Sequence, residues 1–223
     1  VEEGVKQNVR NWQPEYIPQL FKFTQVAIAM NPETVKYGTA GTRQEFYCKW
    51  HEEDVQWQEE AAKRYVDDGH ITEQDRVIVS MLSKKRLLDI IRFYILYDSG
   101  IKKVARYQQF FGVENTMRRI YGEDDCPNRG GVIWHTQGSG KSFSMTFLAG
   151  NLIKNKDLNN PTILVITDRN DLDDQLYSTF CSASEFLRQE PIKCDSRLDV
   201  KTFLEGRKTG GVVFSTIQKF EEE

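Results

Sequence analysis

Residues 136–142 read Thr136-Gln137-Gly138-Ser139-Gly140-Lys141-Ser142, and they lie between an apolar run, Val132-Ile133-Trp134, and a stretch with helical periodicity. Strand, glycine turn and helix, in that order, form the context in which a G-x-G-K-[ST] segment cradles phosphate. Gly138 and Gly140 lack a Cβ and can adopt positive φ, so successive N–H groups can approach a polyphosphate closely. A nucleoside triphosphate is therefore the first ligand to consider.

The loop residues have distinct expected roles in binding ATP and Mg²⁺. The helix that begins near Gly140 adds N–H donors and the positive end of its dipole. Lys141 is the expected catalytic residue, placed to reach the β- and γ-phosphates, and the Ser142 hydroxyl is the expected Mg²⁺ ligand. The full set of expected nucleotide contacts within the loop comprises Thr136, Gln137, Gly138, Ser139, Gly140, Lys141 and Ser142.

One position departs from the eight-residue pattern G-x-x-x-x-G-K-[ST], because His135 stands where that pattern has its first glycine. The form found here, x-T-x-G-S-G-K-S, is typical of helicase-like motors rather than of kinases or small GTPases. A chance glycine turn before a helix is the alternative interpretation.

Length and composition indicate an ordinary globular chain of one or two domains, with 223 residues, 39% hydrophobic and 28% charged. No apolar run of 18 or more residues and no signal peptide is visible, so we expect a cytoplasmic protein without membrane contact. Its four cysteines form no C-x-x-C pair and are expected to be free thiols. The net charge of −3 does not indicate a polyanion partner, although DNA motors can confine their cationic groups to one groove.

The chain divides into three parts by pattern. Alternation on both sides of Asn31-Pro32-Glu33, over residues 16–39, predicts a β-hairpin at the end of a domain that begins upstream. Residues 52–105 carry apolar residues at helical spacing and predict a helical connector, with Ser83 as an N-cap. The basic cluster Lys84-Lys85-Arg86 either contacts phosphate or forms a solvated helix face.

From about residue 106 the pattern alternates between strand and helix. We expect strands at 131–135, 162–167 and 211–215, and helices at roughly 141–155, 171–181 and 198–205. Short β-branched strands separated by helices predict a parallel, doubly covered α/β sheet. Ligands in such folds bind beyond the carboxyl ends of the strands, where the glycine-rich loop is expected.

Four segments in this order resemble the motor (restriction, R) subunit of type I restriction-modification enzymes, a superfamily 2 DNA translocase fused to a nuclease domain. The resemblance is specific over residues 106–220 and looser upstream, where the hairpin ending Lys36-Tyr37-Gly38-Thr39 is similar to the last part of the nuclease domain. The four segments are Arg106-Tyr107-Gln108-Gln109-Phe110-Phe111-Gly112-Val113, Trp134-His135-Thr136-Gln137-Gly138-Ser139-Gly140-Lys141-Ser142, Thr167-Asp168-Arg169-Asn170-Asp171-Leu172-Asp173-Asp174-Gln175-Leu176 and Phe214-Ser215-Thr216-Ile217-Gln218-Lys219-Phe220.

The resemblance implies a RecA-like P-loop NTPase domain at residues 106–223, a helical connector at 51–105 and the C-terminal part of a restriction-nuclease-like α/β domain at 1–50. It implies ATP-dependent translocation and cleavage of double-stranded DNA by an endonuclease that works with methylation and specificity subunits. The chain is expected to be an internal fragment that hydrolyses ATP poorly by itself, because it contains no D-E-x-H box to hold Mg²⁺ and orient the attacking water. It also contains no E-x-K triplet, which the resemblance implies for the metal site of the nuclease centre.

Further site residues come from the same resemblance. It assigns Gln109 to adenine reading, for which a carboxamide offers both a donor and an acceptor; the alternative is a surface helix glutamine. It assigns Arg169, Thr216 and Gln218 to DNA backbone contacts. Arg169 could instead pair with an acidic neighbour, and the other two could cap a strand end. The acidic neighbours are Asp168, Asp171 and Asp173.

Two other functions stay open from the sequence. One is a different superfamily 2 helicase, translocase or remodeller, and the other is a nucleotide-gated DNA-binding module without nuclease activity. Both predict ATP binding.

Overall fold

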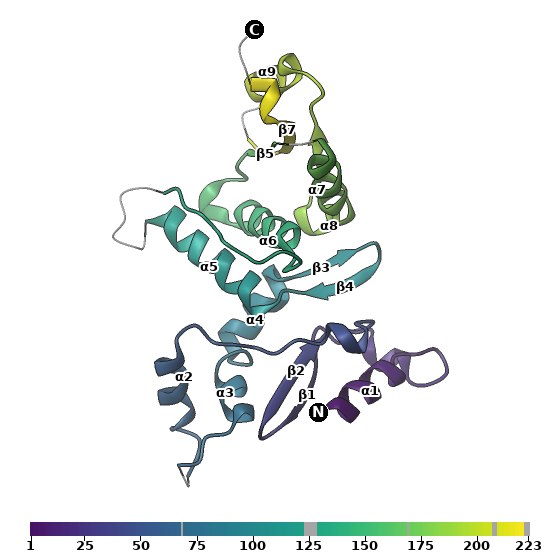
Figure 1. The fold of residues 1–223 in the computed structure, drawn as a ribbon, viewed down its shortest axis with the longest axis vertical. Coiled ribbons are helices and arrows are strands. Elements are labelled where there is room, and N and C mark those ends of the chain that lie inside the picture. Colours follow the sequence, from purple (N-terminus) through teal and green to yellow (C-terminus); the bar gives the residue numbers. More distant parts are fainter. Residues whose placement is uncertain (68, 123–128, 169, 207–208, 221–223) are drawn as a thin grey trace. The chain divides into compact units, whose positions relative to one another are not determined.

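The computed structural model describes residues 1–67, 69–122, 129–168, 170–206 and 209–220. The chain forms two compact units (Figure 1). The N-terminal unit comprises Val1–Leu96 and Gly100–Phe111, and the C-terminal unit comprises Tyr97–Ser99 and Gly112–Glu223.

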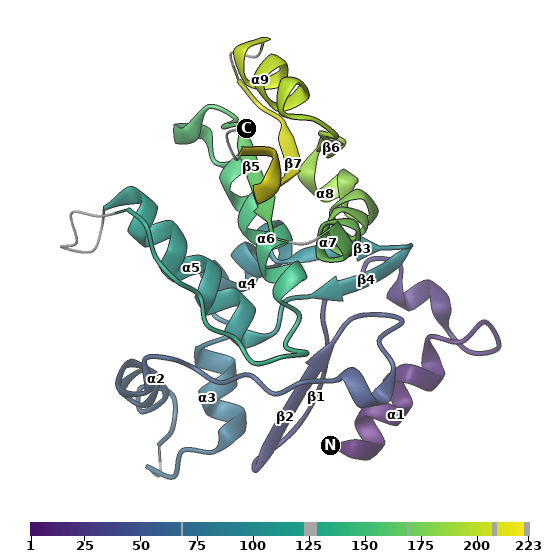
Figure 2. The ribbon, with the colours of Figure 1, turned by 45° about the horizontal axis from the view of Figure 1, so that its top comes forward.

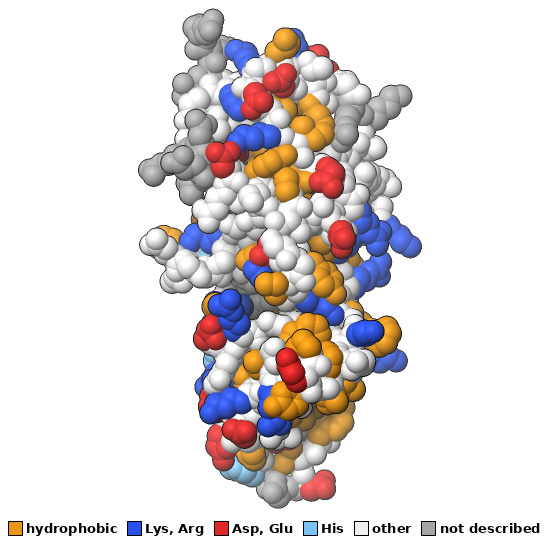
Figure 3. Space-filling view, turned by 90° about the vertical axis from the view of Figure 1, so that its right-hand side faces the viewer, with side chains coloured by type: hydrophobic (Ala, Val, Ile, Leu, Met, Phe, Trp, Pro, Cys, Tyr) orange, Lys and Arg blue, Asp and Glu red, His pale blue; other side chains and the backbone are white. Residues whose placement is uncertain are grey.

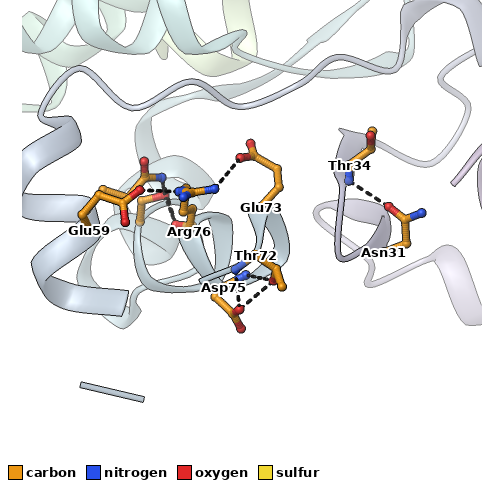
Figure 4. Close-up of polar contacts among 9 residues, drawn as sticks. Asn31, Thr34, Glu59, Thr72, Glu73, Asp75 and Arg76 are labelled. Atoms are coloured by element: carbon orange, nitrogen blue, oxygen red, sulfur yellow. Dashed lines mark hydrogen bonds and ion pairs between the residues drawn. The ribbon is translucent and has the colours of Figure 1, made fainter. Parts of the chain in front are cut away.

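The N-terminal unit contains the predicted hairpin. It begins with α1 (Glu2–Asn11), followed by a 3₁₀ helix at Pro18–Phe21 where the sequence alternation had predicted extended chain. Strands β1 (Ala27–Asn31) and β2 (Thr34–Gly38) then pair antiparallel. The Asn31 side chain closes the turn, since its Oδ1 accepts the Thr34 N–H at 2.8 Å (Figure 4). The hairpin around Asn31-Pro32 is therefore confirmed.

The predicted connector region contains α2 (Val55–Ala62), α3 (Glu73–Val79) and α4 (Lys84–Phe93). Helices α2 and α3 are joined by polar contacts that bury the Gln58 side chain, whose Nε2 donates to the Arg76 carbonyl and to the Ser80 hydroxyl, both at 3.0 Å. A capping box between Thr72 and Asp75 begins α3 (Figure 4).

Two details of the connector differ from expectation. Helix α4 ends at Phe93, and the chain then forms a hairpin of β3 (Ile95–Asp98) and β4 (Ile101–Val104). Ser99 and Gly100, with φ of 51° and 81°, supply the two positive-φ positions of a tight hairpin turn. Ser83 occupies the N-cap position of α4, but its hydroxyl donates to the Ser80 carbonyl instead of capping the helix.

The C-terminal unit contains a parallel sheet in the order β5-β7-β6 (Figure 2). Its strands are β5 (Ile163–Thr167), β6 (Ile192–Lys193) and β7 (Val212–Thr216), joined through α7 (Asn170–Ser182), α8 (Ser184–Leu187) and α9 (Arg197–Gly206). The fully buried Phe214 ring of β7 meets the rings of Tyr177 and Phe180 edge-on. The predicted mixed α/β fold with a parallel sheet is confirmed; β6, with two residues, was too short to predict.

The predicted strand at 131–135 is not found. Within the described residues this segment has no strand pairing, and Val132 and Trp134 are 93% and 88% exposed. A strand needs a neighbouring strand to pair its backbone N–H and C=O groups. The apolar, β-branched composition of this segment was therefore insufficient to produce one.

Helix α5 (Tyr107–Tyr121) belongs to both units, and α6 (Lys141–Lys154) packs in the C-terminal unit against α7 and α8. Among the described residues no helix has the length and apolarity to cross a membrane. Cys48, Cys181 and Cys194 are free thiols, and Cys126 lies outside the described residues.

Candidate functional site

The backbone of the glycine-rich loop adopts the conformation expected of a phosphate cradle. Gly138 has φ of 76°, and Gly140 has φ of 83° in the left-handed region. Gly140 is the N-cap of α6, and its carbonyl accepts the Ser144 N–H at 3.1 Å. A Cβ added at Gly138 would meet no atom within 4 Å, so the face of the loop at this glycine is open. The loop therefore presents an open backbone turn directly before the N-terminus of a 14-residue helix.

The ammonium group of Lys141 is held against this loop. Its Nζ donates to the carbonyls of His135 at 2.7 Å and Thr136 at 3.0 Å, and the side chain is solvent-exposed. The two carbonyls hold this positive charge over the loop. An incoming phosphate oxygen can replace them, because an exposed ammonium has three donors that rotate freely.

Ser139 shapes the loop from inside, a role that the sequence analysis missed. Its side chain is buried, and its hydroxyl donates to the Thr136 carbonyl at 2.7 Å, while its N–H donates to the same carbonyl at 3.3 Å. The same carbonyl also accepts from Lys141. The signal in the sequence is the spacing of three residues between Thr136 and Ser139, which is the spacing of a single turn.

The donor set fits ATP with Mg²⁺ held mainly by the phosphates. Ser142 follows Lys141 in the first turn of α6 and brings one hydroxyl oxygen. Mg²⁺ prefers six oxygen ligands and keeps several waters, so one protein oxygen beside two phosphate oxygens is a sufficient set. The described residues hold no cluster of His, Cys, Asp and Glu side chains that could bind a metal without the nucleotide.

Gln109 lies in the first turn of α5, in the N-terminal unit. It is 4% exposed, and its Oε1 accepts the Arg106 N–H at 2.9 Å, so it caps the helix rather than lying on a solvated surface. The alternative of a surface helix glutamine is thus wrong. Adenine reading stays a prediction.

The structure brings together two of the segments predicted to contact DNA. The exposed Gln218 donates its Nε2 hydrogen to the Asp168 carbonyl at 2.8 Å, which links the residues that follow β7 to those that follow β5. Thr216 is 2% exposed, so its hydroxyl faces the protein in this structure. Arg169 lies outside the described residues.

The carboxylate of Asp173 already has partners. It is fully buried, accepts the Thr167 hydroxyl at 3.2 Å and lies 3.0 Å from Lys193 Nζ. Hydrogen bonds to Asp174 and Asp173 raise the pKa of Lys193 above its usual value. Of the three acidic residues that could pair with Arg169, Asp173 is therefore already paired with Lys193.

The described residues of the face in Figure 3 carry charges of both signs and form no large basic patch. Figure 3 shows Lys and Arg side chains interspersed with Asp and Glu over the described residues of one face. The net charge is −3. The described residues of this face therefore show no broad basic surface of the kind that binds nucleic acid through charge alone.

Comparison of the sequence with known proteins identifies a family for the chain that carries this loop. The sequence model of the SWI2/SNF2 ATPase family matches residues 108–223, which include the whole loop. The chain is 37% identical over 217 residues to the type I restriction enzyme HindI endonuclease subunit of Haemophilus influenzae, covering 93% of this chain and 20% of that protein. It is 33% identical over 220 residues to the putative type I restriction enzyme MjaIXP endonuclease subunit of Methanocaldococcus jannaschii, covering 92% and 20%.

The chain thus spans about a fifth of the length of these curated relatives. Residues 108–223 contain both the loop and the parallel sheet, and that sheet fits the RecA-like domain of such ATPases. The chain belongs to the SWI2/SNF2 ATPase family and is homologous to the endonuclease subunits of type I restriction enzymes.

Proposed function

We propose that this chain is part of the endonuclease and motor subunit of a type I restriction enzyme, in which ATP hydrolysis drives translocation along double-stranded DNA and leads to its cleavage. The observation that carries the proposal is the formed loop, with the Lys141 ammonium held over it by two backbone carbonyls. This loop lies in a chain whose relatives are named as endonuclease subunits of such enzymes.

Each loop residue has a distinct part in the proposed chemistry. The backbone N–H groups at Gly138 and Gly140 would bind and orient the phosphates, and Lys141 would exchange its carbonyl partners for β- and γ-phosphate oxygens. Ser142 would hold Mg²⁺, which supplies charge neutralisation between the phosphates when it is bound. The residues 136–142 alone supply no group to orient an attacking water, so we expect the isolated chain to hydrolyse ATP slowly.

The other assignments extend this proposal over the rest of the chain. Residues 1–50 would belong to a nuclease-like domain, 51–105 to a connector and 106–223 to the first RecA-like motor domain. Gln109 would read adenine. Gln218, exposed beside the Asp168 carbonyl, would contact the DNA backbone together with Arg169, and Thr216 would do so only if its surroundings opened. Methylation and specificity subunits would be the partners, in the cytoplasm.

The test uses the full-length protein assembled with its methylation and specificity subunits. Displacement of a DNA triplex measures translocation, and loss of supercoiled plasmid measures cleavage. We expect Lys141→Ala to abolish both activities, because the γ-phosphate loses its cation, at a cost of about 10²-fold or more in rate. Lys156→Ala, an exposed lysine in the 3₁₀ helix after α6, is the matched control and is expected to retain both.

The outcomes separate the proposal from its rivals. Translocation without cleavage by the intact assembly would identify a motor without nuclease activity. Nucleotide binding without translocation would identify a nucleotide-gated DNA-binding module. Either result, or full activity in Lys141→Ala, would contradict the proposal.

A further inference from the structure

The guanidinium group of Arg86 lies among four aromatic rings of the N-terminal unit. Arg86 belongs to α4, and the rings come from the segment 50–57 and from the start of α5. The distances from its Cζ to the ring centroids are 5.9 Å for Trp50, 5.3 Å for Trp57, 5.7 Å for Phe110 and 5.5 Å for Phe111. We refer to these five residues as the Arg86 cluster.

A carboxylate anchors the cation inside this cluster. Arg86 pairs with Glu52, whose side chain is 2% exposed and also accepts the Trp50 indole N–H at 3.5 Å. A planar guanidinium stacks flat on rings while its fork of N–H donors binds a carboxylate, a geometry that an ammonium lacks. Arg86 is therefore neither a phosphate ligand nor part of a solvated helix face, whereas Lys84 and Lys85 are exposed.

The cluster fixes the start of α5 from several directions. The Trp50 ring lies 5.3 Å from the Phe110 ring and 5.4 Å from the Phe111 ring, and the Tyr94 ring lies 4.6 Å from the Phe110 ring. The Tyr37 hydroxyl donates to the Ala105 carbonyl at 2.9 Å, just before the helix. The first turn of α5 is thus held by elements that are far away in the sequence.

Gln109 lies at the start of α5, beside Phe110 in the chain. It directly precedes Phe110 and Phe111, and its Oε1 accepts the Arg106 N–H at 2.9 Å. Because adjacent backbone positions in a helix move together, a change in the packing of the two phenylalanine rings will reorient the turn that carries the Gln109 carboxamide.

We propose that Arg86 is a positioning residue for adenine recognition, which acts through the start of α5 on Gln109. This inference rests on the proposed role of Gln109 in reading adenine. Arg86 sets the preference for ATP over GTP without touching the nucleotide, because it fixes the turn that carries the Gln109 carboxamide.

The experiment compares titrations of the 223-residue chain with Mg·ATP and with Mg·GTP. The variants are Arg86→Lys, Gln109→Ala and the double variant, with near-ultraviolet circular dichroism to verify folding. Arg10→Lys is the matched control, since Arg10 is exposed and lies 5.4 Å from the centroid of one ring, Tyr16. Trp57→Leu removes one ring of the cluster while keeping an apolar side chain, and it serves if Arg86→Lys does not fold.

We expect Arg86→Lys and Trp57→Leu to lower the ratio of ATP to GTP affinity by at least about threefold, and Gln109→Ala to lower it by about tenfold. Arg10→Lys should leave the ratio unchanged. In the Gln109→Ala background, Arg86→Lys should change the ratio by less than about twofold, because the two residues act in series.

The results that would contradict this inference differ in which claim they overturn. A folded Arg86→Lys with an unchanged ratio, or an undiminished effect in the Gln109→Ala background, would overturn this inference alone. An unchanged ratio in Gln109→Ala would overturn the adenine role of Gln109 and this inference with it. Failure of the unsubstituted chain to bind either nucleotide would count against the proposed function itself.

Discussion

Residues 136–142 and the five residues before them are neighbours in the chain, yet different interactions determine their structures. The loop has its expected backbone, with positive φ at Gly138 and Gly140, whereas residues 131–135 have no strand pairing among the described residues. A turn and a helix start are determined within a few residues, because glycine permits the backbone and a single carbonyl closes the turn. A strand depends on a distant partner. The comparison separates local from non-local sources of structure.

The largest expected effect contrasts a paired strand with the unpaired segment. Phe214→Ala in β7 should lower the free energy of unfolding of the C-terminal unit by about 3–5 kcal/mol, since it leaves a cavity beside Tyr177 and Phe180. Trp134→Ser should change it by less than about 0.5 kcal/mol, because Trp134 is 88% exposed. Urea denaturation measures both. A loss above about 1 kcal/mol in Trp134→Ser would show that residues 131–135 are packed in solution.

The next effect concerns close packing that the sequence does not reveal. A Cβ added at Gly150 in α6 would lie 2.0 Å from Cε1 of Phe186 in α8. Gly150→Ala should therefore lower the free energy of unfolding by about 1–3 kcal/mol, as in other overpacked cores. Gly206→Ala at the end of α9 is the control, since a Cβ there meets no atom within 4 Å and should stabilise the unit by about 0.4–1 kcal/mol. Equal effects of the two substitutions would contradict the packing of α6 on α8.

A smaller effect tests the loop against the preceding segment directly. Gly138→Ala should lower the free energy of unfolding by about 1–2 kcal/mol, because the φ of 76° disfavours any residue with a Cβ although the surrounding space is open. Gly131→Ala, where φ is not positive and space is also open, should change it by less than about 0.5 kcal/mol. Calorimetric melting compares the two, and a neutral Gly138→Ala would mean that the loop relaxes out of the left-handed region.

The smallest effect is a pH dependence at another locally encoded feature, the capping box of α3. The Thr72 hydroxyl, followed by the Thr72 N–H, donates to the Asp75 carboxylate and lowers its pKa. A lowered pKa stabilises the folded state above the unfolded pKa of about 3.9, and this contribution is lost as pH falls through the folded value. The melting temperature of the chain should exceed that of Asp75→Asn at pH 7, and the difference should shrink below about pH 4. A constant difference down to pH 2 would contradict this linkage.

The features predictable from the sequence were those with local causes. The Asn31-Pro32 hairpin, the helices within residues 52–105 and the loop at Gly138 and Gly140 all carry their signals within a few residues. The two strands 162–167 and 211–215 were also predictable, because they are apolar, β-branched and bounded by turn residues, and the structure pairs them as β5 and β7.

The features that could not be predicted depend on contacts between distant residues. Nothing near Arg86 in the sequence indicates that its guanidinium meets rings of residues 50–57 and of α5. The partner of Lys193 and the burial of Thr216 likewise depend on how the sheet assembles. The positive-φ turn at Ser99-Gly100 had a local signal, but the helical pattern of residues 52–105 concealed it.

The most direct test of the local origin of the nucleotide site is a calorimetric titration of the 223-residue chain with Mg·ATP, beside Lys141→Ala and the control Lys156→Ala. If the loop is formed without a paired strand at 131–135, the unsubstituted chain and Lys156→Ala will bind Mg·ATP, and Lys141→Ala will lose binding. Equal affinity in Lys141→Ala, or no binding by the unsubstituted chain, would contradict the claim that residues 136–142 form a working phosphate cradle by themselves.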